Sequence, residues 1–153
     1  MTISYSKTLA ATDPIFSPNA GQVASVTQII TVGTADLTQN TTFDICYVPP
    51  NARVLDGFLV ATDMDSGSSL TIIVGDSGDT DRFINAGTIG QTAMRMDFGN
   101  NATAAASLIT HQGTNYTSAT KIYGTFSNAP GTAVAGTIAA TVFYTVVEPP
   151  GTI

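Results

Sequence analysis

Two short clusters of aspartates are the residues whose types and spacing are most suggestive of chemistry: Asp63 and Asp65, then Asp76, Asp79 and Asp81. Carboxylates two or three residues apart in a glycine-containing loop can wrap a hard cation such as Ca²⁺. Two acids that face one cleft can act as a catalytic pair. Aspartate and glycine also favour turns for purely local reasons, through hydrogen bonds to nearby backbone and tolerance of left-handed conformations. No EF-hand spacing is present, so the clusters are interpreted as structural turns, with Ca²⁺ binding and paired catalytic carboxylates as alternatives. Pairing of Asp79 or Asp81 with Arg82 or Arg53 is a further structural role.

The single histidine and the single cysteine offer little to catalysis. His111 lies in a polar stretch, and the chain has no G-x-S-x-G motif, so a solvated loop position is favoured over a catalytic triad. Cys46 sits inside a strand-like apolar run, which predicts a buried, inert thiol. With one cysteine and one histidine no zinc site is expected. The sequence therefore nominates no catalytic, cofactor-binding or metal-ligating residue and predicts a protein that is not an enzyme.

The composition narrows the fold class. Only 10% of the 153 residues are charged, against about 25% in typical globular proteins. One glutamate and two lysines cannot coat exposed helix faces, which excludes a helical bundle. The net charge of −6 and five scattered cations argue against direct nucleic-acid binding. No apolar stretch is long enough for a transmembrane helix.

Short apolar runs separated by turn signals predict an all-β sandwich of jelly-roll type, with about eight strands. Strands are expected at 22–33, 43–48, 53–62, 70–75, 82–84, 121–127 and 135–147. Strict alternation in the second places Phe43, Ile45 and Tyr47 on one face. In the third, alternation places Val54, Phe58 and Val60 on one side and Leu55, Leu59 and Ala61 on the other. Both faces of that strand are apolar, which indicates a central strand or one covered by a second subunit.

The chain divides into an extended N-terminal arm at 1–20 and a single β-sandwich domain at 21–153. Pro14 and Pro18 interrupt the first segment, and its apolar residues are too sparse for a core layer. Residues 1–14 contain no apolar core of a secretory signal. Together with the lone cysteine, this is compatible with synthesis in a reducing cytoplasm. Residues 85–119 are rich in Gly, Asn, Ala and Thr, with apolar patches only at 94–98 and 108–110.

Two segments resemble a pattern found in small virion proteins of tailed bacteriophages. The first, at 48–60, is a proline-containing turn followed by a strand with V-x-D-G; the second, at 70–84, ends in V-G-D-x-G-D-x-D-R-F-I. The closing hairpin at 125–147, with Ala-Pro-Gly in its turn, is similar to the C-terminus of the same group. The group is that of the head decoration, or capsid cement, proteins of β-sandwich type. The resemblance spans about residues 20–147 but does not include the pattern at 85–119.

This resemblance implies a structural protein on the outer surface of the virion, made in the bacterial host cytoplasm. It implies binding to the major capsid protein at capsomer junctions, stabilisation of the shell, and a homotrimer. The low charge and the two-sided apolar strand also favour self-association. The alternative function is a receptor- or carbohydrate-binding module of a phage tail or fibre, which would need an exposed aromatic platform; the absence of Trp weighs against it.

Overall fold

The computed structural model describes residues 2–3, 22–99 and 114–147 of the chain. They form ten strands and one short 3-10 turn, Thr34–Asp36. The strands are β1 Thr2–Ile3, β2 Val23–Val32, β3 Thr42–Val48, β4 Ala52–Ala61, β5 Thr71–Asp76, β6 Asp79–Gly87, β7 Met94–Asp97, β8 Asn115–Tyr116, β9 Thr120–Asn128 and β10 Gly136–Val146. The predicted strands at 22–33, 43–48, 53–62, 70–75, 121–127 and 135–147 are confirmed to within two residues at each end. The predicted run at 82–84 is part of the longer β6.

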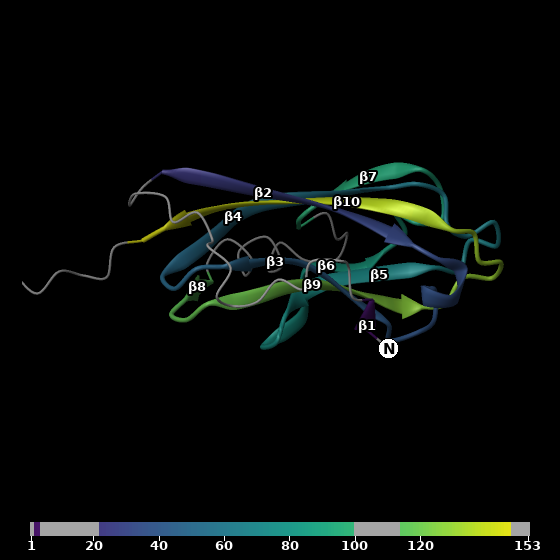
Figure 1. The fold of residues 1–153 in the computed structure, drawn as a ribbon, viewed down its shortest axis with the longest axis horizontal. Coiled ribbons are helices and arrows are strands. Elements are labelled where there is room, and N and C mark those ends of the chain that lie inside the picture. Colours follow the sequence, from purple (N-terminus) through teal and green to yellow (C-terminus); the bar gives the residue numbers. More distant parts are fainter. Residues whose placement is uncertain (1, 4–21, 100–113, 148–153) are drawn as a thin grey trace, which may run out of the picture.

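The strands make two sheets that pack face to face, as Figure 1 shows. One sheet has the order β2-β10-β4-β7, with β8 added beside β4; the other has the order β1-β3-β9-β5-β6. Apart from β1, the strands pair from the outside of the sequence inward: β2 with β10, β3 with β9, β4 with β7, and β5 with β6. This nested antiparallel pairing is a jelly roll, so the predicted all-β sandwich is confirmed.

The core lies between the two sheets and is apolar. Phe43 and Phe126 meet with ring centroids 5.3 Å apart, and Phe83 stacks on Phe98 at 4.9 Å. Gly124 on β9 has a packing reason, because a Cβ atom there would come within 2.1 Å of the Phe43 ring. The core residues thus come from both sheets, as the alternating pattern of apolar residues requires.

β-Bulges correct two details of the predicted strand faces. In β4 the pairing with β10 skips Leu55, because a bulge inserts one residue and reverses the alternation beyond it. Val54 and Leu59 therefore both point into the core, while Phe58 and Val60 face outward. The prediction that Val54 shares a face with Phe58 and Val60 was wrong.

A second register shift, at Ile45 in β3, has the same effect. Cys46 and Val48 are buried beyond it, whereas Tyr47 is only half-buried. The predicted common face of Phe43, Ile45 and Tyr47 therefore holds for the first two residues and is wrong for Tyr47.

The N-terminal segment touches the sandwich at one described point. Thr2 and Ile3 form β1, which pairs in parallel with Thr42 and Phe43 at the edge of the second sheet. The sequence predicts an arm outside the fold, and at these two residues the main chain instead extends a sheet. The rest of the predicted arm lies outside the described residues. No helix in the described parts of the chain has the length and apolar character to cross a membrane.

Candidate functional site

The Asp76 carboxylate organises the turn that carries the second aspartate cluster. It is 2% exposed, at the end of β5. Its Oδ1 accepts hydrogen bonds from the backbone N–H groups of Gly78 and Asp79, at 2.8 and 3.0 Å. Its Oδ2 accepts from Arg82 Nε and from the Tyr116 hydroxyl, both at 2.7 Å. Both carboxylate oxygens therefore already have protein donors.

Burial and hydrogen bonds shift the pKa values of Asp76, Tyr116 and Asp81. Burial acts to raise the pKa of Asp76, but hydrogen bonds from Arg82, Tyr116 and Gly78 outweigh it, so the pKa is lowered. Burial raises the pKa of the Tyr116 hydroxyl well above its ordinary range, and the hydrogen bond to Asp76 raises it further. The pKa of Asp81 is raised, chiefly by its hydrogen bond with Asp79. Tyr116 thus stays a neutral donor to a carboxylate at neutral pH.

The structure brings Asp76, Asp79 and Arg82 together. Arg82 Nε lies 2.7 Å from Asp76, and Arg82 Nη1 lies 3.9 Å from Asp79. The principal partner of Arg82 is thus Asp76 rather than Asp79 or Asp81. Within the described part of the chain, no three His, Cys, Asp or Glu side chains are grouped as a metal site would require.

We expect the turn at 76–81 to keep its stability without metal, because Arg82 and backbone N–H groups already balance its charge. The melting temperature should be the same, within error, in EDTA and in millimolar Ca²⁺. A bound ion would stabilise the folded state by mass action. A melting temperature that fell in EDTA and recovered with Ca²⁺ would instead identify Asp76, Asp79 and Asp81 as ligands.

Asp65, in the first cluster, ties two connections between the sheets. It is fully buried. Its Oδ1 accepts from the N–H groups of Gly67 and Thr132 at 2.8 and 3.1 Å, and its Oδ2 accepts from those of Ser69 and Leu70. The residues before β5 are thereby bound to the connection from β9 to β10, seen at the right of Figure 1. Asp63 only accepts a hydrogen bond from the N–H of Asp65, so this pair does not face a common cleft as catalytic acids would.

This network predicts a specific acid sensitivity. Burial acts to raise the pKa of Asp65, but the four backbone donors outweigh it and lower the pKa from 3.8 to about 2. A carboxyl whose pKa is lower in the folded state than in the unfolded state stabilises the fold above the unfolded value, and that stabilisation is lost on acidification. The melting temperature should therefore fall between about pH 4 and pH 2. The Asp65→Asn variant should have a lower melting temperature than the wild type at neutral pH, and its melting temperature should fall less between about pH 4 and pH 2. An equal slope of melting temperature against pH in both proteins would contradict this assignment.

The two buried carboxylates sit at opposite ends of β5, since Asp65 precedes the strand and Asp76 closes it. Each joins elements of different sheets: Asp76 belongs to the second sheet, while Tyr116 is in β8, which pairs with β4. Their hydrogen bonds are all to groups of the fold itself. The arrangement stabilises the sandwich, and it does not present a free acid or base to a substrate.

The single cysteine adds no chemistry. Cys46 is buried as predicted, and burial raises the pKa of its thiol to about 12. It is thus protonated and inaccessible at neutral pH. His111 lies outside the described residues.

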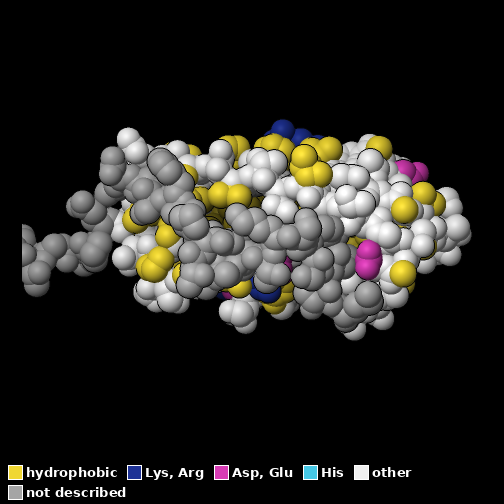
Figure 2. Space-filling view, in the orientation of Figure 1, with side chains coloured by type: hydrophobic (Ala, Val, Ile, Leu, Met, Phe, Trp, Pro, Cys, Tyr) yellow, Lys and Arg dark blue, Asp and Glu magenta, His cyan; other side chains and the backbone are white. Residues whose placement is uncertain are grey.

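The feature that sequence analysis missed is the outer face of the β2-β10-β4-β7 sheet. β2 and β10 together contain no charged residue, and the charged residues of this face are on β4 and β7. Three large apolar side chains on this face are exposed: Val23, Ile29 and Val60. Along the upper side of the molecule, Figure 2 shows hydrophobic side chains spaced among uncharged polar ones, with dark-blue Lys or Arg atoms at the top. Surfaces with so little charge are typical of the cores of protein–protein interfaces.

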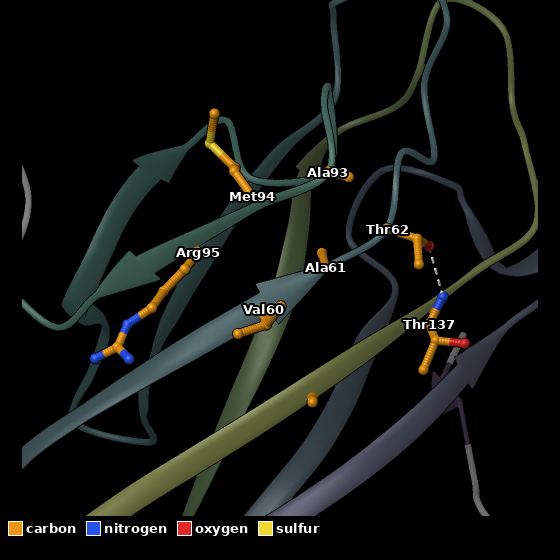
Figure 3. Close-up of a pocket in the computed structure, with 8 residues that line it drawn as sticks. Val60, Ala61, Thr62, Ala93, Met94, Arg95 and Thr137 are labelled. Carbon is orange, nitrogen blue, oxygen red and sulfur yellow. Dashed lines mark hydrogen bonds between the residues drawn. The ribbon is translucent and has the colours of Figure 1, made fainter.

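A shallow groove of about 500 Å³ crosses this face between β4, β7 and β10 (Figure 3). Its lining is mostly small or apolar: Val60, Ala61, Thr62, Ala93, Met94, Arg95, Thr137 and Ala139. At its border Arg95 lies over the Phe58 ring, 3.9 Å from the centroid, and pairs with Asp97 at 2.6 Å. The groove contains no acid–base pair, and its chemistry suits a partner surface rather than a substrate.

Three solved structures contain chains that share this fold. A chain in the capsid of Ralstonia phage GP4 is 21% identical, with a TM-score of 0.71, over 91% of this chain and 96% of that one. A chain of the cyanophage Pam1 capsid asymmetric unit is also 21% identical, with a TM-score of 0.67, over 93% and 99%. A chain in the acidic stable capsid structure of Helicobacter pylori bacteriophage KHP30 is 12% identical, with a TM-score of 0.57, over 83% and 90%.

The sequence matches no protein-family model and no curated protein. The likeness to the capsid chains is therefore one of fold, at low sequence identity. It extends over nearly the whole length of the GP4 and Pam1 chains.

Proposed function

We propose that the protein is a structural component of a tailed-bacteriophage virion that decorates the outside of the capsid. In this function it binds the major capsid protein at capsomer junctions, as a homotrimer, and stabilises the shell. It is synthesised in the host cytoplasm and acts without cofactor, catalysis, nucleic acid or membrane. The observation that carries the proposal is the near full-length similarity to chains of two phage capsids.

The physical character of the chain supports this function. Its buried carboxylates are used to join the two sheets, and its single thiol is buried. On the outer face of one sheet, β2 and β10 carry no charged residue. A decoration protein needs a stable, chemically inert module with surfaces for protein partners, and these features meet that need.

The alternative, a tail or fibre module that binds a receptor or carbohydrate, has less support. Of the aromatic side chains in the groove region, Phe58 and Phe143 lie 6.2 Å apart and are only partly exposed. Arg95 covers Phe58, so they do not form an open platform for a sugar ring.

Reconstitution on capsids tests the proposal. Purified heads of the phage that encodes the chain, prepared without this protein, should bind it saturably in co-sedimentation and become more resistant to heat. Binding to tails but not to heads would support the alternative. The absence of saturable binding to heads would contradict the proposal.

A further inference from the structure

We propose that a second copy of this chain packs on the outer face of the β2-β10-β4-β7 sheet, defined by the outward side chains of these four strands. The inference deepens the self-association part of the proposed function, on which it rests, by assigning one of the surfaces through which each copy contacts the next. Three properties of this face carry it: the distribution of charge, the character of the β2 edge and the available area.

The distribution of charge favours a copy as the occupant. The outer face carries two arginines and two aspartates, Arg53, Asp56, Arg95 and Asp97, all on β4 and β7. Their charges cancel, so the net charge of −6 resides on the rest of the chain. Two copies of an acidic protein repel each other elsewhere, because like charges brought together are unfavourable. A different protein could bring basic residues to the acidic surfaces, whereas a copy of this chain is itself acidic. The electrically balanced outer face is therefore the surface that a copy can approach without repulsion.

The outermost strand of this sheet, which borders the outer face, lacks the usual protection against pairing with a second chain. β2 spans ten residues at the sheet edge and contains neither a charged residue nor a proline. Proteins usually protect long edge strands with charges, prolines or bulges, or by covering them. β2 has neither a charge nor a proline. It also has no bulge, because its pairing with β10 is regular along its whole length. Val23 and Ile29 on this strand are 62% and 67% exposed, as expected for residues that a second copy covers.

The area of the face is sufficient for a specific contact. β2, β10 and β4 have about ten residues each and β7 has four; at about 4.8 Å between strands and about 3.3 Å per residue they give a face of about 550 Å². A second copy that covers it would bury about 1,100 Å² in total, just above the roughly 1,000 Å² that a specific interface should exceed.

Val60 lies within the proposed contact, at the groove. Val60 lies on β4 opposite Ala139 of β10 and Arg95 of β7, and Figure 3 shows it beside the groove. A charge introduced there would have to be desolvated when a copy packs on the face. Val134, in the connection before β10, offers a matched control because it is also a valine, and it is 42% exposed against 41% for Val60.

The test compares Val60→Lys with Val134→Lys in the full-length protein by sedimentation equilibrium. Both variants reduce the net charge from −6 to −5, so general repulsion between copies decreases equally in both. We expect the dissociation constant of the oligomer to rise at least tenfold in Val60→Lys and to stay near the wild-type value in Val134→Lys. A melting curve of each variant checks folding; if Val60→Lys does not fold, Val60→Thr retains the β-branched shape and should weaken association by a smaller factor.

The outcomes separate this inference from the proposed function. An oligomer that is equally stable in the wild type and in all variants would overturn the assignment of the face, while self-association would stand. A wild-type protein that sediments as a monomer of about 16 kDa at tens of micromolar would overturn both self-association and the assigned face. Co-sedimentation with capsids, measured separately on the same samples, reports on decoration itself.

Discussion

Replacing Asp76 by alanine should destabilise the fold by about 3–5 kcal/mol, the usual cost of removing one partner of a buried ion pair. The substitution leaves Arg82 and the Tyr116 hydroxyl without their shared acceptor, and it also removes the acceptor of two backbone N–H groups in the turn. Because single domains have a free energy of unfolding of about 5–15 kcal/mol, the loss is a large fraction of the total. Urea denaturation measures it directly.

Two further variants separate the contributions. Tyr116→Phe removes only one hydrogen bond to the carboxylate and should cost about 1.5–3 kcal/mol. Asp79→Asn changes a residue that lies 3.9 Å from Arg82 and is partly exposed, so its effect should be within about 0.5 kcal/mol. If Asp76→Ala were no more destabilising than Asp79→Asn, the buried network would not have the structural role assigned to it.

Deleting residues 1–18 should weaken capsid attachment by orders of magnitude while the melting temperature stays nearly unchanged. We propose that this segment attaches the protein to its partners: covering Ile15 and Phe16 on a capsid would contribute about 1.5–3 kcal/mol for each side chain. A trimer carries three such arms, and the later ones bind at high effective concentration. Among the described contacts, the deletion removes the two-residue pairing of β1 with β3. Co-sedimentation and thermal melting provide the two measurements.

A matched control is the full-length protein with Ile15 and Phe16 both replaced by serine, which retains the chain length and the β1 pairing. Attachment should fall in this variant also. If the truncated protein failed to fold, the segment would belong to the sandwich. If it decorated capsids as well as the full chain does, the capsid-binding surface would lie elsewhere, for example within 85–119.

The strand pattern could be predicted because alternation of apolar and polar residues reports directly on a half-buried sheet. In β10, Ile138, Ala140, Val142 and Tyr144 alternate with outward residues and are all buried, as the sequence indicates. The faces of β3 and β4 could not be predicted fully. A β-bulge changes the alternation without a marked change in composition, and Ile45 and Leu55 look like ordinary strand residues.

The candidate site was less accessible to sequence reasoning, because its decisive contacts join residues far apart in the chain. Asp76 is separated from Tyr116 by 40 residues, and Asp65 from Thr132 by 67. The sequence indicates that the aspartates are turn residues, but it does not indicate that Asp65 and Asp76 are buried. One available signal was Tyr116 itself, an aromatic residue in a polar segment, since a buried tyrosine hydroxyl usually needs a hydrogen-bond partner.

The outer face of the β2-β10-β4-β7 sheet also depended on the structure. The sequence showed that 53–62 is apolar on both sides and suggested a covering subunit. Only the pairing of β4 with β10, and of β10 with β2, shows that Phe58 and Val60 join the uncharged outward residues of two other strands in one surface. The interaction surface is thus a property of the sheet order rather than of any one segment.

A cryo-EM map of the intact virion, at a resolution that traces side chains, is the most direct test of the proposed decoration function. We predict density for this jelly roll on the outside of the head at the junctions between capsomers, in contact with the major capsid protein and grouped in threes. Density for the chain in the tail or a fibre, or its absence from the outer surface of the head, would contradict the proposal.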